Sequence, residues 1–358
     1  MKVAIVGAGL SGLSCAFELK KHGITPTIFE KNTVLGDSLD YAVSNFKIMT
    51  NFYTSPRKYF KKNYGLDIVP VGMLKKIIMI GPSNQTVVRG RLGYILKKGL
   101  EPYSMENQIA RQVNLPINFN TYVRIDDIKD DFDYIVWATG NNKLPRELNL
   151  WTSTFNTYIR IATLIGNFKT STATAWLNTE YARNGYAYLT PYSKKNATLT
   201  LIVNNIVPEE LDFYWKEFLD KEHIEYKILE TRDVEYIAGT TSPMKLNNIY
   251  FVGNSGGLTE SCLGCGSINA IESGIITARC IAKKLDYDKL MKKTVNLIKT
   301  NHEFRKVLNT FDNNDFDKFV AFLGLPVVKQ FIYNNPFFKA NNAAQIIKYY
   351  NKFVENSI

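Results

Sequence analysis

Short apolar runs that end in glycine-containing turns occur at three places and predict buried strands of a parallel sheet. The first run, 2–6, leads into a glycine-rich segment, after which apolar residues recur at helical spacing. The second, 134–138, ends in Thr139-Gly140, and the third, 249–252, ends in Gly253-Asn254. Strands that are covered on both faces read as continuous apolar runs. The pattern therefore predicts an α/β fold built on a Rossmann-like sheet.

The first run opens a βαβ unit whose turn reads Gly7-Ala8-Gly9-Leu10-Ser11-Gly12. Gly7 permits the tight turn, Gly9 lets the backbone approach a pyrophosphate, and Gly12 lets the helix pack closely on the strand. The helix N-terminus offers free N–H groups to the phosphates. Glu30 ends the second strand about 20 residues further on, where a carboxylate accepts the ribose hydroxyls and disfavours a 2′-phosphate. A dinucleotide is predicted here, and the turn alone does not distinguish FAD from NAD.

The third run leads into a second glycine-rich loop, which ends in Cys262-Leu263-Gly264-Cys265-Gly266 and opens a predicted helix over 268–284. The N-terminus of that helix would stabilise negative charge on a reduced flavin ring. Thiols at a helix N-terminus favour the thiolate. We hypothesise that Cys265, with Cys262 beside it, faces the flavin as a proton donor or thiol relay. The alternative is that both are small apolar residues of a tight loop. Glu260 is a further candidate acid, with a plain surface carboxylate as the alternative.

Metal and Ser/His/Asp chemistry have no support in the sequence. The three histidines, His22, His223 and His302, stand at scattered positions without cysteine or acidic partners. The two sulfurs of the Cys-x-x-Cys pair lack a second pair of ligands for zinc. We therefore expect no metal site.

The middle of the chain is rich in strand-forming residues. The segments 76–80 and 85–88 flank Gly81-Pro82-Ser83-Asn84 and predict a hairpin. Several further strands are expected over 155–205, of which 198–203 is the clearest. These regions are expected to form one sheet that covers the cofactor and encloses the substrate.

Helical periodicity marks the remaining elements. Ser104 is expected to cap a helix that runs to about 113, and Pro208 begins another that runs to about 221. From about 289 the pattern is helical and basic, and it is broken at Pro326 and Pro336. We expect packing helices there, with a cover over the substrate cavity or a membrane contact as alternatives.

Composition limits the partners and the cellular compartment that the protein is expected to have. The chain has 358 residues, four cysteines and a formal charge of +11, without a clustered stripe of Lys and Arg. Nucleic acid is therefore disfavoured as a partner. So few cysteines do not make a disulfide framework, and no apolar stretch reaches the ~18 residues that span a bilayer. These features predict a cytoplasmic protein, with peripheral contact with a membrane as an alternative.

Three segments, in this order, resemble the p-hydroxybenzoate hydroxylase-type flavoproteins, most closely their geranylgeranyl reductase branch. They are Gly7 to Glu30, Ala138-Thr139-Gly140, and Gly253 to Gly274. The resemblance implies FAD as cofactor. In that family an Asp follows the late glycine and hydrogen-bonds the ribityl chain. Asn254 stands here, and it keeps hydrogen-bonding groups without the charge.

The segment Tyr186 to Pro191 is similar to the branch's aromatic substrate-cavity motif. Tyr188 stands where the motif has Trp, and Thr190 where it has Phe. The branch also has an early cysteine–glycine turn over the flavin, whereas the corresponding Gly36-Asp37-Ser38 has no Cys. These departures concern the substrate rather than the cofactor.

The patterns and the resemblance together imply a set of site residues. Those implied for FAD are Gly7, Ala8, Gly9, Leu10, Ser11, Gly12, Glu30, Lys31, Val123, Thr139, Gly140, Gly253, Asn254, Gly264 and Gly266. Those implied for the substrate are Tyr186, Tyr188 and Pro191, and the hypothesised catalytic residues are Cys265 and Cys262.

The predicted architecture has three parts. A discontinuous Rossmann-like FAD-binding domain comprises 1–65, 90–150 and 240–285. An inserted β-sheet substrate domain comprises 66–89 and 151–239, and a C-terminal helical region comprises 286–358.

The predicted function is FAD-dependent reduction of carbon–carbon double bonds in an apolar, isoprenoid-like substrate. Electrons would come from NAD(P)H or a ferredoxin-like donor, because the chain carries one dinucleotide fingerprint. The alternatives are a monooxygenase of the p-hydroxybenzoate hydroxylase type and a flavin-binding protein without turnover. A flavin-dependent halogenase is disfavoured, since the sequence has no Trp-x-Trp-x-Ile-Pro.

Overall fold

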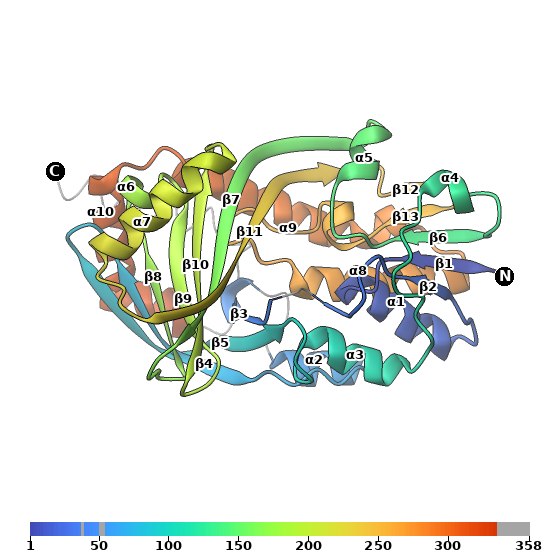
Figure 1. Ribbon diagram of the computed structural model, residues 1–358, viewed down its shortest axis with the longest axis horizontal. Coiled ribbons are helices and arrows are strands. Elements are labelled where there is room, and N and C mark those ends of the chain that lie inside the picture. Colours follow the sequence, from blue (N-terminus) through green and yellow to red (C-terminus); the bar gives the residue numbers. More distant parts are fainter. Residues whose placement is uncertain (37–38, 50–53, 335–358) are drawn as a thin grey trace.

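The predicted apolar runs lie side by side in one sheet of the computed structural model, which describes residues 1–36, 39–49 and 54–334 (Figure 1). Its described strands follow the order β12 (Lys245–Leu246), β13 (Ile249–Phe251), β6 (Tyr134–Trp137), β1 (Val3–Val6) and β2 (Thr27–Phe29). β12 is antiparallel to its neighbour and the others are parallel. Since β1, β6 and β13 are adjacent, their glycine-containing carboxyl ends meet at one edge of the sheet. The predicted α/β, Rossmann-like fold class is confirmed.

Two helices that begin at glycine turns pack against each other beside this sheet. α1 (Leu10–Lys21) follows β1, and α8 (Ser267–Lys283) follows the Cys-x-x-Cys loop. Their backbones approach closely, because a Cβ added to Gly274 would lie 2.1 Å from the carbonyl oxygen of Ser11. This contact brings the first and the last glycine turns of the chain together.

A buried carboxyl group also ties these helices together. Glu18 is 2% exposed and accepts hydrogen bonds from Nε of Arg279 at 2.7 Å and Nζ of Lys21 at 3.0 Å. Burial raises the pKa of Glu18, but the bonds and charges of these two cations outweigh it and hold the pKa below its usual value. The ionised form of Glu18 is therefore bound more strongly in the folded state.

Stability should consequently weaken in acid. A carboxyl group with a lowered folded-state pKa stabilises the fold above its unfolded pKa of about 4.3, and this contribution is lost as the pH falls through the folded value. Glu18→Gln should lower the free energy of unfolding at pH 7 by about 2 kcal/mol, with a smaller difference at pH 3. Thermal unfolding of both proteins between pH 7 and 3 measures this. A difference that does not change with pH would contradict the assignment.

The β-rich segments form a second sheet, at the other end of the molecule (Figure 1). Its described strands follow the order β11 (Lys227–Thr241), β7 (Trp151–Ile165), β10 (Asn196–Asn204), β9 (Tyr186–Pro191), β8 (Thr172–Trp176), β4 (Gly72–Ile80), β5 (Gln85–Lys98) and β3 (Tyr41–Phe46). Only the β4–β8 pair is parallel among these neighbours. The long strands β7 and β11 run together from this sheet to the parallel one (Figure 1).

The predicted hairpin is β4–β5, and the predicted strands over 155–205 are part of the same sheet. The sheet also takes in β3 and the whole of β5, beyond the ranges 66–89 and 151–239. The division of the chain into domains stays a prediction.

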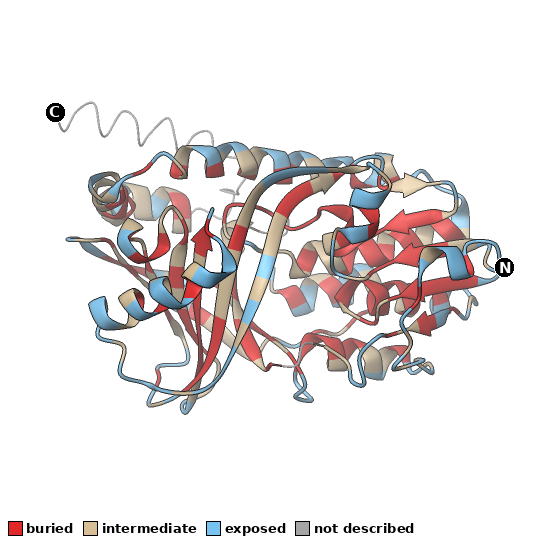
Figure 2. Ribbon diagram, turned by 45° about the horizontal axis from the view of Figure 1, so that its top comes forward, coloured by how far each residue is buried: buried red, intermediate tan, exposed pale blue. Residues whose placement is uncertain are grey.

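One face of the second sheet is covered by α7 (Leu211–Lys221) and the short α6 (Thr179–Ala182). α7 buries Trp215 and Phe218 in a cluster that includes Trp176, while its other face is exposed (Figure 2). The predicted helix after Pro208 is confirmed, with a 3₁₀ turn over Pro208–Glu210 before it.

The helices after 286 lead from the core beside the parallel sheet, where Tyr287 and Met291 pack, to the opposite face of the second sheet. They are α9 (Tyr287–Leu308), α10 (Asn313–Gly324) and α11 (Pro326–Lys329), followed by a π-helical turn over Gln330–Asn334. Apolar side chains of α10 pack with those of β4 and β5. Pro326 interrupts the helical run as predicted, and Pro336 lies outside the described residues.

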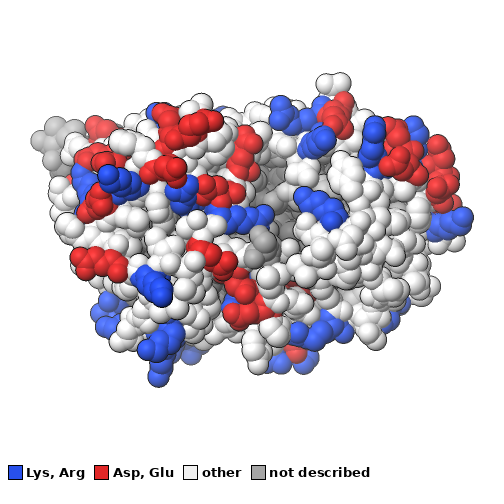
Figure 3. Space-filling model, in the orientation of Figure 1, with Lys and Arg blue, Asp and Glu red and all other residues white. Residues whose placement is uncertain are grey.

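Two properties of the described residues bear on the partners of the protein: the distribution of surface charge and the hydropathy of the helices. Basic and acidic side chains are interspersed over the face shown in Figure 3. Across residues 1–36, 39–49 and 54–334, no helix is long and apolar enough to cross a membrane.

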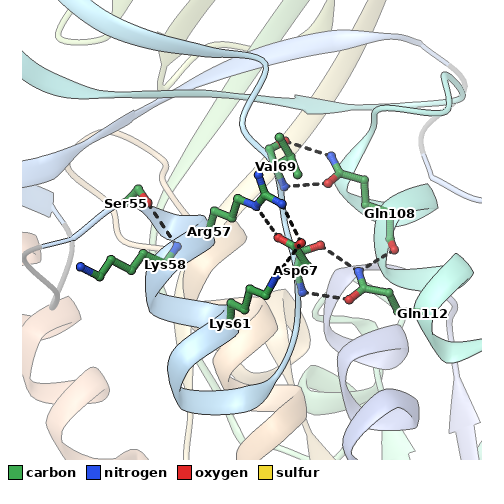
Figure 4. Close-up of polar contacts among 8 residues, drawn as sticks. All are labelled: Ser55, Arg57, Lys58, Lys61, Asp67, Val69, Gln108 and Gln112. Atoms are coloured by element: carbon green, nitrogen blue, oxygen red, sulfur yellow. Dashed lines mark hydrogen bonds and ion pairs between the residues drawn. The ribbon is translucent and has the colours of Figure 1, made fainter.

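Two side chains on α3 (Met105–Val113) fix the segment that follows α2 (Pro56–Tyr64), as Figure 4 shows. The Gln108 amide accepts from the N–H of Val69 at 2.7 Å and donates to its carbonyl oxygen at 3.1 Å. Gln112, one turn later, makes the same pair with the backbone of Asp67. These bonds satisfy backbone groups that have no strand partner. The predicted cap of α3 is also confirmed, since the Ser104 hydroxyl accepts from the N–H of Asn107.

Candidate functional site: three glycine turns and an apolar cavity

Each glycine of the first turn meets a different steric demand. A Cβ on Gly7, at φ +105°, would lie 2.4 Å from the carbonyl oxygen of Ala138. A Cβ on Gly12 would lie 2.0 Å from the carbonyl oxygen of Gly7, whereas one on Gly9 would meet nothing within 4 Å. Gly7 and Gly12 are therefore required by the packing of the protein itself. Gly9 borders open space, as expected of the residue that a pyrophosphate approaches.

Glu30 lies directly beside this turn. Its carboxyl group is 9% exposed and accepts from the N–H of Ala8 at 2.8 Å and from the N–H of Asn32 at 2.9 Å. The two bonds hold the carboxyl group between the end of β2 and the first turn. This is the position in which a ribose would meet it.

The ends of the three central strands contact one another through small polar residues. The Thr139 hydroxyl lies 3.2 Å from the Ser255 hydroxyl, which joins β6 to β13. A Cβ on Gly253 would lie 2.9 Å from Oγ of Ser11, so the third turn lies against the first. The amide oxygen of Asn254 accepts from the Thr259 hydroxyl at 2.6 Å.

Gly140 and Gly264 resemble Gly9 in bordering open space. Both have positive φ, +74° and +66°, and a Cβ on either would meet nothing within 4 Å. Gly266, the N-cap of α8, would place a Cβ 2.5 Å from Oγ1 of Thr259. Each of the three turns thus has one glycine, Gly9, Gly140 or Gly264, whose Cα borders open space.

The remaining residues predicted for the cofactor lie on either side of the sheet. Leu10 and Ser11 are buried in α1, and Val123 is buried in an apolar cluster with Val6. Lys31 is exposed after β2. Positions 37 and 38 of the early turn lie outside the described residues.

Glu260 organises the loop that carries the two cysteines. It is 3% exposed, so it is not a surface carboxyl group. Its oxygens accept from the N–H groups of Cys262 at 2.8 Å, Leu263 at 2.9 Å and Cys265 at 2.9 Å. Burial raises the pKa of Glu260, and these three donors oppose that effect. The side chain is a positioning group for the loop.

The expectation that this loop stabilises a thiolate is not met by the surroundings of the sulfurs. Burial, and next the charge of Glu260, raise the pKa of both Cys262 and Cys265 above the usual thiol range. A helix N-terminus lowers a thiol pKa, but desolvation and a neighbouring carboxyl group act in the opposite direction and outweigh it. Both residues are free cysteines and are favoured as neutral thiols.

An apolar cavity of about 260 Å³ opens beside this loop. The loop forms one wall, with Cys262 and Gly264 to Ser267. Strands β3, β4, β8 and β9 form another wall, and α9, α10 and the π-helical turn close the remaining side. The cavity therefore lies between the glycine turns and the second sheet.

Tyr186 and Tyr188, predicted for the substrate, both line this cavity. The Tyr186 hydroxyl donates to the carbonyl oxygen of Leu263 at 2.7 Å, and the two rings lie 5.8 Å apart. Burial raises the pKa of Tyr188 to about 12, so its phenol stays neutral. Pro191 is buried at the end of β9 and is not among the described cavity residues, although Thr190 is.

The sequence did not single out the α9 side chains that line the cavity. Asn301, Arg305 and Leu308 recur at helical spacing on its cavity side. The available sequence signal was that Asn301 and Arg305 are polar residues on an otherwise apolar face of the helix. The other walls of the cavity come from segments such as β9 and α10, which local spacing in α9 does not reveal.

Part of the chain matches known proteins in sequence. Residues 5–62 match the NAD(P)-binding Rossmann-like domain family. The NADPH-dependent glutamate synthase small chain of Halomonas elongata is 36% identical over 61 residues, 17% of this chain and 13% of that protein. The digeranylgeranylglycerophospholipid reductase of Methanocella arvoryzae is 28% identical over 119 residues, 32% of this chain and 30% of that protein. The match thus spans under a third of either relative's length.

Solved structures are similar over nearly the whole chain. A geranylgeranyl bacteriochlorophyll reductase-like protein from Thermoplasma acidophilum has a TM-score of 0.72 at 14% identity, with 98% of both chains covered. The flavin-dependent halogenase CmlS has a TM-score of 0.64 at 14% identity, with 98% of this chain and 70% of that chain covered. At these identities the likeness concerns the fold.

Proposed function

Because the chain has the fold of the geranylgeranyl reductase-like FAD-dependent oxidoreductases, we propose that it uses FAD to reduce carbon–carbon double bonds of an apolar substrate. The curated reductase from Methanocella arvoryzae, whose name gives a geranylgeranyl phospholipid as substrate, supports an isoprenoid-like molecule. The electron donor is proposed to be NAD(P)H or a ferredoxin-like protein. The predicted resemblance is confirmed at the level of the fold.

The residues of the three turns fit FAD. The open space beside Gly9 at the N-terminus of α1 would take the pyrophosphate, and Glu30, bonded to the N–H of Ala8, would accept the ribose hydroxyls. Gly140 and Gly264 leave room for the remainder of the molecule. Asn254 would offer the hydrogen bond that the family's Asp provides. When bound, FAD supplies hydride transfer.

The observation that carries the proposal is the cavity itself. It is lined mainly by apolar side chains and adjoins Gly264 and Gly266, the turn predicted to meet the flavin ring. An apolar double bond needs a binding surface of this kind, close to the cofactor and shielded from water. The neutral phenol of Tyr188 and the neutral thiol of Cys265 are two of the protonated groups that line this space.

Product mass separates the candidate reactions. Holoprotein would be incubated with an unsaturated isoprenoid and with NADPH or a reduced ferredoxin, in air and under nitrogen. Reduction adds two hydrogens per double bond and proceeds without oxygen. A product that gains one oxygen atom, formed only in air, would instead assign the chain to the monooxygenases. No product with either donor, while bound flavin stays oxidised, would support a flavin-binding role without turnover.

Substitution of Cys265 tests whether its thiol supplies the proton that is added to the double bond. Reduction of a double bond requires one hydride and one proton, and a neutral thiol in the cavity wall can supply the proton. Cys265→Ser should slow product formation about 10²-fold, the usual size of a general-acid contribution, and leave flavin reduction unchanged. Cys15→Ser, buried in α1 away from the cavity, is the matched control. Unchanged turnover in Cys265→Ser would leave the thiol with a packing role.

A further inference from the structure

Arg305 is the one charged side chain among the described residues that line the apolar cavity. It is 3% exposed. Its Nε donates to the Asn309 amide oxygen at 2.8 Å, and its buried Nη2 has no hydrogen-bond partner within the described part of the chain. A guanidinium group has five N–H donors in a rigid plane. Part of this donor set is therefore left for a ligand.

The protein does not neutralise this cation with a carboxyl group of its own. Among the described residues, no carboxyl oxygen lies within ion-pair distance of Arg305. Glu260, which acts on it electrostatically, already accepts three backbone N–H groups. An unpaired buried cation costs several kcal/mol, and this cost is offset when an anion is bound beside it.

The surroundings of Arg305 define an amphipathic space. Asn301, one helical turn earlier, is 3% exposed and also lines the cavity. The rest of the lining is dominated by aliphatic and aromatic side chains, such as Ile77, Phe316 and Phe319. A wholly apolar substrate would leave the Arg305 donors unsatisfied. A molecule with an apolar chain and one anionic group would contact the apolar walls with its chain and accept hydrogen bonds from Arg305 with its anionic group.

We propose that the cavity binds a single-chain carboxylate amphiphile, whose head group pairs with Arg305 and whose unsaturated chain lies against the apolar walls. A planar carboxylate matches the guanidinium plane through two parallel N–H bonds. A phosphate monoester carries close to two charges at neutral pH, whereas the described cavity residues supply one cation. The cavity of about 260 Å³ lies near the lower end of the volumes of ligand sites, which favours one chain over two.

This inference names the substrate class of the proposed function and rests on that function only for turnover. Binding can be measured without it. The holoprotein would be titrated, oxidised and without an electron donor, with parinaric acid, whose conjugated chain fluoresces in an apolar site. Its methyl ester has the same chain without the charge. We expect the acid to bind at least about 10-fold more tightly than the ester, because one charge-assisted pair has that value.

Variants locate the effect at Arg305. Arg305→Gln should weaken binding of the acid at least about 10-fold and leave binding of the ester within a factor of two. Arg305→Lys keeps the charge but loses the planar pair of donors. Its affinity for the acid should lie between those of the wild-type protein and Arg305→Gln. Lys306→Gln, the exposed neighbour, removes the same charge and is the matched control with unchanged binding. Thermal unfolding of each variant shows whether it is folded.

Each outcome bears on the inference. Equal affinity of the wild-type protein for acid and ester overturns it without reference to any variant. Tighter competition by dodecyl phosphate than by lauric acid overturns the choice of carboxylate. If the acid binds through Arg305 but its chain is never reduced when a donor is added, the binding inference stands and the proposed reductase function fails.

Discussion

Gly9→Val is expected to abolish FAD binding while leaving the protein folded. The backbone of Gly9 is extended, with φ −81° and ψ −172°, and a Cβ there would meet nothing within 4 Å. The side chain would instead fill the space that the pyrophosphate requires. Affinity for FAD should fall at least about 100-fold, equivalent to about 2.7 kcal/mol. Flavin absorbance after reconstitution and thermal unfolding of the protein without FAD measure the two effects.

Gly12→Ala provides the contrast. Its Cβ would lie 2.0 Å from the carbonyl oxygen of Gly7, so the variant should lose stability even without the cofactor. We expect a cost of about 2–3 kcal/mol, seen as a lower melting temperature. If Gly9→Val retained normal flavin content, FAD would not approach the turn, and the assignment of the first glycine loop would be wrong.

Glu260→Ala should free the loop that carries the two cysteines. The substitution removes the acceptor of three backbone N–H groups, one buried and two partly buried, and leaving a buried donor unsatisfied costs about 1–3 kcal/mol before the loop rearranges. Opening should then expose Cys262 and Cys265. Their rate of labelling by a thiol reagent should rise at least about 30-fold, as a change of about 2 kcal/mol in the opening equilibrium implies.

Two comparisons sharpen this result. Glu260→Gln keeps one acceptor oxygen and should show a smaller increase. Glu303→Ala changes an exposed carboxyl group on α9 and should leave labelling unchanged. Peptide mapping by mass spectrometry separates the loop cysteines from Cys15 and Cys280, which are buried elsewhere. Labelling of Cys262 and Cys265 at the wild-type rate in Glu260→Ala would exclude Glu260 as the group that holds the loop.

The local sequence pattern was not sufficient to predict the protonation state of the two cysteines. The position of Cys265 before α8 predicts a thiolate, because helix N-termini favour negative charge. The carboxyl group of Glu260, five residues earlier, folds back on the same loop and, with burial, has the larger effect on the sulfur. Sequence distance alone gave no indication that this carboxyl group is buried.

Among the residues that line the cavity, some were predicted from the sequence and others were found only in the structure. The resemblance implied Tyr186 and Tyr188 for the substrate, and both line the cavity because they stand two residues apart on β9 and share one face of the sheet. Arg305 belongs to a helix whose sequence fits a plain packing helix equally well. Its importance follows from the walls around it, to which β4, β9 and α10 contribute.

Local sequence was sufficient to predict the first glycine turn, the acid that follows it, and the strands and helix on either side. Their signals are confined to about 30 residues, within which sterics and hydrogen bonding fix the backbone. The meeting of the three turns at one edge of the parallel sheet, and the burial of Arg305 in the wall of an apolar cavity, emerge from the fold of the whole described chain. Burial and the pairing of charges depend on chain segments far apart in sequence, and local spacing does not encode them.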